Sequence, residues 1–134
     1  MLNTSIPLSG MQAANLRSTA AANNIANMSS DGALPVPGQP ANTPVPYQPV
    51  QVEQTATGAT GGTAATVTPV SPAFVARYDP SAAYANNQGQ VAAPNVDVMN
   101  EILNIAMAKT DFTANADVAG AVNQMVKQLF ELRT

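Results

Sequence analysis

Asp97 and Glu101 are the two residues of this chain whose spacing suits acid–base chemistry. They lie four positions apart, at the start of a stretch with helical periodicity, so both carboxylates would stand on one side of a helix. Paired carboxylates can act as general acid and base when their pKa values differ. Capping of the helix start and attraction to the positive end of the helix dipole explain both residues more simply. We therefore interpret the pair as structural.

Other signatures of catalysis are missing from the sequence. The chain contains no histidine and no cysteine, so the usual nucleophile–base pairs and thiolate metal sites cannot be assembled. The glycine-rich segment from Gly58 to Gly62 lacks the Gly-Lys-Ser/Thr continuation of a phosphate-binding loop. We expect no enzymatic activity, no catalytic residue, no metal site and no cofactor.

The composition favours a subunit of an assembly. Charged residues make up 10% and aromatic residues 4% of the chain, whereas about 25% of residues are charged in typical soluble proteins. A surface with so few charges suits burial against neighbouring subunits. The few basic residues are dispersed in a chain of net charge −3, so we expect neither nucleic acid nor a small-molecule substrate as a partner.

Helical periodicity is confined to the two ends of the chain. The first stretch runs from about Thr4 to Asn27, and the turn-forming residues after Asn27 should end it. The second runs from Asp97 to Leu132, with Asn95 or Asp97 as its cap, and would be roughly 54 Å long. Its apolar residues follow a heptad rhythm, at Val98, Ile102, Ile105, Phe112, Ala116, Ala119, Val126 and Phe130.

The segment between the two helices lacks helical pattern. Prolines recur from Leu34 to Pro49, which predicts an extended linker. Alternating residues predict two strands of a hairpin with a glycine-rich tip, and a third short strand follows before turn signals lead to the final helix. In order, these segments are Tyr47 to Gln54, the tip Thr57 to Gly62, Thr63 to Val70, Phe74 to Tyr78, Asp79-Pro80 and Asn86 to Gly89.

The N-terminal helix is too short to cover the apolar stripe of the C-terminal one. It is about ten residues shorter, so part of the stripe must face other subunits or stay unfolded until assembly. Neither a spanning helix nor a cleaved secretory signal is expected, because no long apolar run or basic leader is visible.

Three ordered motifs span the chain and carry a family resemblance. In order they are Ser9-Gly10-Met11 with Asn23-Asn24-Ile25-Ala26-Asn27; Arg77-Tyr78-Asp79-Pro80 with Gly89-Gln90-Val91 and Pro94-Asn95-Val96-Asp97-Val98; and Glu101-Ile102-Leu103 with Phe112-Thr113-Ala114-Asn115.

The order and spacing of these motifs resemble the axial rod and hook family of the bacterial flagellum, and within it the proximal rod proteins of the FlgC type. One departure stands just before Phe112, where families of this type usually carry an arginine and this chain has Lys109-Thr110-Asp111. The resemblance implies a mostly α fold, in which long N- and C-terminal helices pack as an antiparallel coiled-coil hairpin around an extended, Pro/Gly-rich middle with a short β-hairpin. The expected boundaries are 1–30 for the first axial helix, 31–94 for the middle and 95–134 for the second.

The resemblance further implies a structural subunit of the flagellar proximal rod, the periplasmic drive shaft that transmits motor torque for motility. Its partners would be further copies of itself, other rod proteins, the export-gate or rod-base adaptor, the surrounding MS ring and the flagellar type III export apparatus, which exports it without a cleaved signal. The alternatives are another axial protein of the rod and hook family, an inner-rod subunit of a related type III secretion apparatus, or a peptidoglycan-acting enzyme of the same machine.

Together, the apolar stripes and the asparagines predict a set of subunit-interface residues. The set is Met11, Leu16, Asn23, Asn24, Ile25, Asn27, Asn95, Val98, Ile102, Ile105, Phe112, Asn115, Ala119, Val122, Val126 and Leu129.

Overall fold

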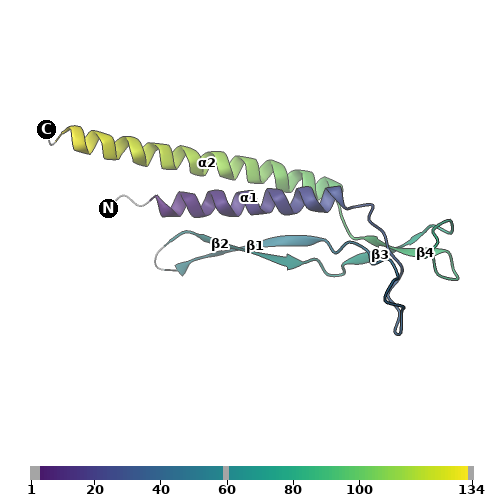
Figure 1. The fold of residues 1–134 in the computed structure, drawn as a ribbon. Coiled ribbons are helices and arrows are strands. Elements are labelled where there is room, and N and C mark those ends of the chain that lie inside the picture. Colours follow the sequence, from purple (N-terminus) through teal and green to yellow (C-terminus); the bar gives the residue numbers. More distant parts are fainter. Residues whose placement is uncertain (1–3, 59–60, 133–134) are drawn as a thin grey trace.

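The chain folds into two helices and two small antiparallel sheets (Figure 1). A computed structural model describes residues 4–58 and 61–132. The elements are, in order, α1 (Ser5–Ala26), β1 (Val50–Ala56), β2 (Thr63–Pro69), β3 (Phe74–Tyr78), β4 (Gln90–Pro94) and α2 (Val98–Glu131).

Helix α1 is the middle layer of the molecule. Antiparallel α2 packs on one side of α1, and the β1–β2 hairpin lies along the other (Figure 1). Close approach is possible because α1 turns alanine toward both neighbours, and Ala13, Ala14, Ala20 and Ala21 are at most 7% exposed. The core is therefore a thin seam of small side chains.

The helix ends follow the sequence expectations. Helix α1 ends at Ala26, immediately before Asn27. At the start of α2, the Asp97 side chain accepts hydrogen bonds from the backbone N–H of Met99 at 3.0 Å and of Asn100 at 3.3 Å, so Asp97 is the cap. The antiparallel helix arrangement also agrees with expectation, whereas a coiled-coil supercoil stays a prediction.

Both sheets are two-stranded. Strands β1 and β2 pair from Val50 opposite Pro69 to Ala56 opposite Thr63, which confirms the expected hairpin; residues 59 and 60 of its expected tip lie outside the described part. Strand β3 has the bounds expected for the third strand, Phe74–Tyr78. It pairs with β4, and neither β4 nor this pairing was predicted from the sequence pattern. Val91, Ala92 and Ala93 of β4 are all at most 5% exposed, so no polar–apolar alternation marks this strand.

The proline-rich segment after α1 forms a projecting loop. It has neither helix nor strand from residue 33 to 49, as the prolines predict, and the Ala33 N–H donates to the Pro44 carbonyl at 2.9 Å to close its base. Gly32 pairs with Ala92 of β4, so this base is joined to the second sheet.

The heptad stripe of α2 coincides only in part with its contact to α1. Ile105, Ala116, Ala119 and Val126 are partly covered, whereas Ile102, Phe112 and Phe130 are 51%, 45% and 67% exposed. Among the described residues of α2, Ala108 alone is buried. Because α1 presents alanine, α2 is covered most fully at the small residue Ala108, and the larger Ile105 and Phe112 border an open pocket between the two helices.

Candidate assembly interface

The side chain of Asn24 is the most highly connected polar group in the described structure. It is 0% exposed, near the C-terminal end of α1. Its Nδ2 donates to the Val50 carbonyl at 2.7 Å and to Glu101 Oε1 at 2.6 Å, while its Oδ1 accepts from the Val50 N–H and the Tyr47 hydroxyl, both at 3.0 Å. One amide thus joins α1, β1, α2 and the end of the proline-rich loop, with every donor and acceptor in use.

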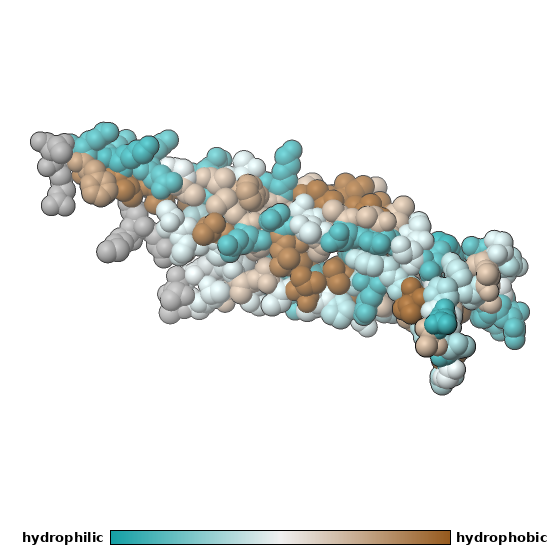
Figure 2. All heavy atoms as spheres, in the orientation of Figure 1, coloured by the Kyte–Doolittle hydropathy of each residue, from teal (hydrophilic) through white to brown (hydrophobic). Residues whose placement is uncertain are grey.

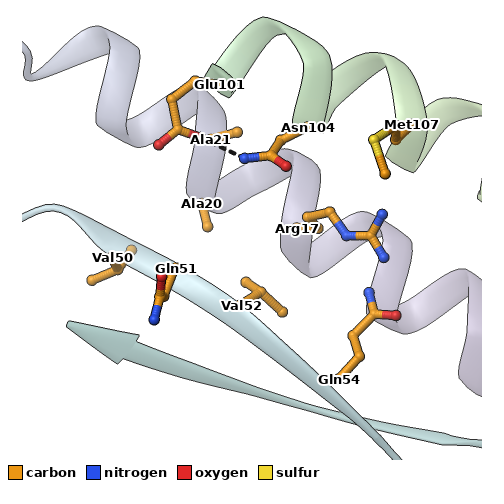
Figure 3. A pocket seen from close by; sticks show the side chains of 10 residues that line it. All are labelled: Arg17, Ala20, Ala21, Val50, Gln51, Val52, Gln54, Glu101, Asn104 and Met107. Atoms are coloured by element: carbon orange, nitrogen blue, oxygen red, sulfur yellow. Dashed lines mark hydrogen bonds between the residues drawn. The ribbon is translucent and has the colours of Figure 1, made fainter. Parts of the chain in front are cut away.

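Tyr47 and Glu101 complete this node. Burial, followed by the charge of Glu101, raises the pKa of Tyr47 above its ordinary value. The second oxygen of Glu101 accepts from Asn104 Nδ2 at 3.2 Å (Figure 3), so both carboxylate oxygens are occupied within the chain. Glu101 is therefore a structural acceptor, in agreement with our interpretation of the Asp97–Glu101 pair.

Ser9 fastens the other end of the β1–β2 hairpin to α1. Its hydroxyl donates to the Ile6 carbonyl at 2.7 Å and accepts from the Thr63 N–H at 3.0 Å. In the hairpin, the N–H and the carbonyl of Val50 bond to Asn24, and the N–H of Thr63 bonds to Ser9, so side chains of α1 pair with backbone groups of both strands. Ser9 and Asn24 therefore hold the hairpin to α1 at both of its ends.

A salt bridge and an open pocket lie between these two attachment points. Arg17 Nη1 is 2.9 Å from Asp111 Oδ2 and links α1 to α2. The pocket, of about 360 Å³, is bordered by α1, α2 and β1, with Arg17, Gln54 and Met107 on its walls (Figure 3).

The second sheet forms a separate, ordered arm. Arg77 of β3 pairs with Asp31, whose side chain is 8% exposed. In the β3–β4 turn, the Ser81 hydroxyl donates to Asp79 at 2.7 Å and is the main cause of a lowered pKa for Asp79. Asn95 donates to the Pro72 carbonyl at 2.9 Å, which anchors the arm to the start of α2.

A long apolar surface remains uncovered on α2. Figure 2 shows hydrophobic residues gathered along this helix, both over α1 and toward the C-terminal end. Its exposed large side chains, between 36% and 83% exposed, are Val98, Met99, Ile102, Leu103, Met107, Phe112, Val118, Met125, Leu129, Phe130 and Leu132.

The structure places the expected interface residues in different surroundings. Those on the surface are Asn23, Val98, Ile102, Phe112 and Leu129. The partly covered ones are Met11, Leu16, Ile25, Asn27, Asn95, Ile105, Asn115, Ala119, Val122 and Val126. Asn24 differs from both groups, since its amide is fully used inside the chain; we do not include it in the contact surface.

Sequence reasoning missed the roles of Tyr47, Ser9 and Arg17. Their partners are 23, 54 and 94 positions away in the chain, so local pattern carried no signal for them.

The described residues offer no alternative site of obvious chemistry. No group of three or more acidic residues in residues 4–58 and 61–132 could hold a metal ion. Within the same residues, neither helix has the length and apolarity needed to cross a lipid bilayer.

Known proteins match the chain over nearly its whole length. It is 32% identical over 125 residues to "Flagellar basal-body rod protein FlgC" of Escherichia coli O157:H7, and equally to the protein of that name from Salmonella typhimurium; each alignment covers 92% of this chain and 90% of the relative. The chain belongs to the FlgC family of flagellar basal-body rod proteins. No family model matches it. As a FlgC family member, it is a structural subunit of the flagellar basal body and assembles with other rod and basal-body components.

Proposed function

We propose that this FlgC family member builds the wall of the proximal rod, through both terminal helices, in the periplasmic shaft that transmits motor torque. The observation that carries the proposal is the uncovered apolar surface of α2, where eleven large side chains from Val98 to Leu132 remain at least 36% exposed. Full burial of each large apolar side chain is worth roughly 1.5–3 kcal/mol. Neighbouring helices would supply that burial, and the alanine faces allow close packing.

The specific partners are also part of the proposal. Further copies, other rod proteins, the export-gate or rod-base adaptor and the MS ring would surround the chain, and the flagellar type III apparatus would export it without a cleaved signal. The proposed contact residues are the expected set without Asn24 and Asn115, because the Asn115 side chain faces Gly10 and donates to the Asp111 carbonyl within the chain. In this role the chain acts mechanically, and its polar node keeps α1, α2 and the hairpin in one rigid arrangement.

Before incorporation, the uncovered part of α2 would remain partly unfolded, because its apolar side chains have no cover in the single chain. Circular dichroism of the purified monomer tests this part of the proposal. A monomer with full helix content and a single cooperative melt contradicts it.

Electron cryomicroscopy of basal bodies purified from the source organism tests the proposal as a whole. Both terminal helices of this chain should be found in the rod wall next to the export gate. Rod density that other proteins account for completely overturns the assignment to the proximal rod.

A further inference from the structure

Gly10 of α1 lies directly against the side chain of Asn115 on α2, with too little space between them for a Cβ. A Cβ added to Gly10 would lie 2.5–2.7 Å from the carboxamide atoms of Asn115. That carboxamide is itself fixed, since its Nδ2 donates to the Asp111 carbonyl at 2.7 Å. Any residue larger than glycine at position 10 therefore requires the Asn115 side chain or the helix to move, and moving the side chain breaks this hydrogen bond.

A second contact lies at the other end of the helix pair, between Asn24 and Glu101. Gly10 and Asn24 are fourteen residues apart on α1, and Glu101 and Asn115 are fourteen residues apart on α2. Fourteen residues are two heptads, or roughly 21 Å of helix. The two contacts therefore specify one and the same antiparallel register, one by shape and the other by hydrogen bonding.

We propose that these two contacts, Gly10–Asn115 and Asn24–Glu101, form a register lock that fixes how far α2 extends beyond α1. In this register Gly120 lies opposite Ser5, so residues 121–131 project past the start of α1 by roughly 16 Å. Figure 1 shows this projecting end of α2. Met125 and Leu129, which lie on it, are 45% and 58% exposed.

Sliding by one helical turn would shift the projecting end by about 5.4 Å. Such a slip would place Asn115 against a side chain in place of Gly10, and would separate Asn24 from Glu101. The consequence for the next subunit rests on the proposed function: the lock presents the apolar end of α2 at a constant position.

Distance measurement between two spin labels tests the lock in the full-length chain. The chain has no cysteine, so cysteines placed at Thr19 and Asp117 carry the only labels; both positions are exposed and lie where α1 and α2 run side by side. We expect one narrow distance for the otherwise unchanged chain and a shift of about 5 Å, close to one helical turn, or a second distance, for Gly10→Ala. The matched control is Gly120→Ala, whose added Cβ meets nothing within 4 Å, and it should keep the original distance.

The compensating variant is decisive. Asn115→Ala removes the atoms that a Cβ at position 10 would strike, so Gly10→Ala/Asn115→Ala should recover the original distance. An unshifted Gly10→Ala chain, or a double variant that stays shifted or unfolded, overturns the lock. If Gly10→Ala alone does not fold, the distance in the double variant still tests the lock.

Swimming of a strain lacking the native gene separates the lock from the proposed function. Gly10→Ala should abolish swimming and the double variant should restore it, whereas Gly120→Ala should swim normally. If the unmodified chain itself fails to restore rods, the proposed function fails while the distances still decide the lock. Normal swimming with a shifted distance overturns the link between register and assembly.

Discussion

The carboxamide of Asn24 satisfies the backbone of β1 as a neighbouring strand would. It bonds both the N–H and the carbonyl of Val50, and it does so from a buried position on a helix. Asparagine is a poor residue for a helix interior, so its presence here reflects this tertiary role. Loss of the amide would leave several buried polar groups without a hydrogen-bond partner. Each buried group that is left unpaired costs free energy.

We expect Asn24→Ala to lower the free energy of unfolding by about 2–4 kcal/mol, because Val50, Tyr47 and Glu101 all lose a partner. Urea unfolding followed by circular dichroism measures the change. Asn23→Ala is the matched control: the same residue type at an adjacent exposed position should change stability by no more than about 0.5 kcal/mol. If the two variants lose the same unfolding free energy, the hydrogen bonds of Asn24 do not have the stabilising role described here.

The raised pKa of Tyr47 predicts that the folded chain loses stability at alkaline pH. Burial and the charge of Glu101 raise its pKa in the folded chain above the value of 10.0, so the folded state favours the protonated phenol. This contribution is fully present below pH 10 and is lost as the pH rises through the folded pKa. Tyr47→Phe should therefore lose about 1 kcal/mol at pH 7, with the hydrogen bond to Asn24, and should show a shallower decline above pH 10.

Urea midpoints between pH 7 and 11 measure that slope. Tyr78→Phe serves as the control, because Tyr78 is 73% exposed and lies in the separate arm. A decline that is unchanged in Tyr47→Phe and abolished in Tyr78→Phe contradicts the prediction.

At the level of elements, the Asp31–Arg77 pair ties the end of α1 to β3. The side chain of Asp31 is nearly buried, while that of Arg77 is about half exposed. Losing the partner of the buried carboxylate should therefore cost more stability than losing the partner of the exposed guanidinium. Arg77→Gln leaves a carboxylate in a covered position and should cost about 1–3 kcal/mol. The double variant Arg77→Gln/Asp31→Asn has no unpaired carboxylate at this position and should recover part of the lost stability. Melting temperatures of the single and double variants measure the recovery. A double variant less stable than Arg77→Gln would contradict this assignment of the cost.

The sequence indicated the elements that are governed by local chemistry. Periodicity identified both helices, Asp97 was identified as a possible cap, and alternation around a glycine-rich tip identified the first hairpin. Strand β4 was missed because Val91, Ala92 and Ala93 are all buried, so its local pattern resembles no half-exposed strand.

Pairing between helices was not predictable in the same way. The apolar stripe suggested where α2 would contact α1, yet Ile102 and Phe112 stay exposed while Ala108 is buried. Likewise, a helical pattern says which residues share a face but not which face a distant helix will cover. Contacts such as Asn24–Glu101, 77 positions apart, depend on that choice of face.

On the scale of the whole molecule, polar contacts and apolar surface are separated. The hydrogen bonds of Ser9 and Asn24 and the salt bridge of Arg17 lie between α1 and its two neighbours, and they hold the single chain together. Large exposed apolar side chains instead lie along α2 and on its projecting end. Changes at that end should therefore affect assembly far more than folding.

Leu129→Glu tests this separation. Leu129 is 58% exposed at the projecting end of α2, so the substitution should change the unfolding free energy of the monomer by no more than about 0.5 kcal/mol. In the rod, however, it would bury an unpaired carboxylate against a neighbour, which costs several kcal/mol, so swimming and rod incorporation should be lost. Gln124→Glu adds the same charge at an exposed polar position nearby and should swim at close to the normal rate. If Leu129→Glu swims like this control, the projecting end of α2 is not a contact between subunits.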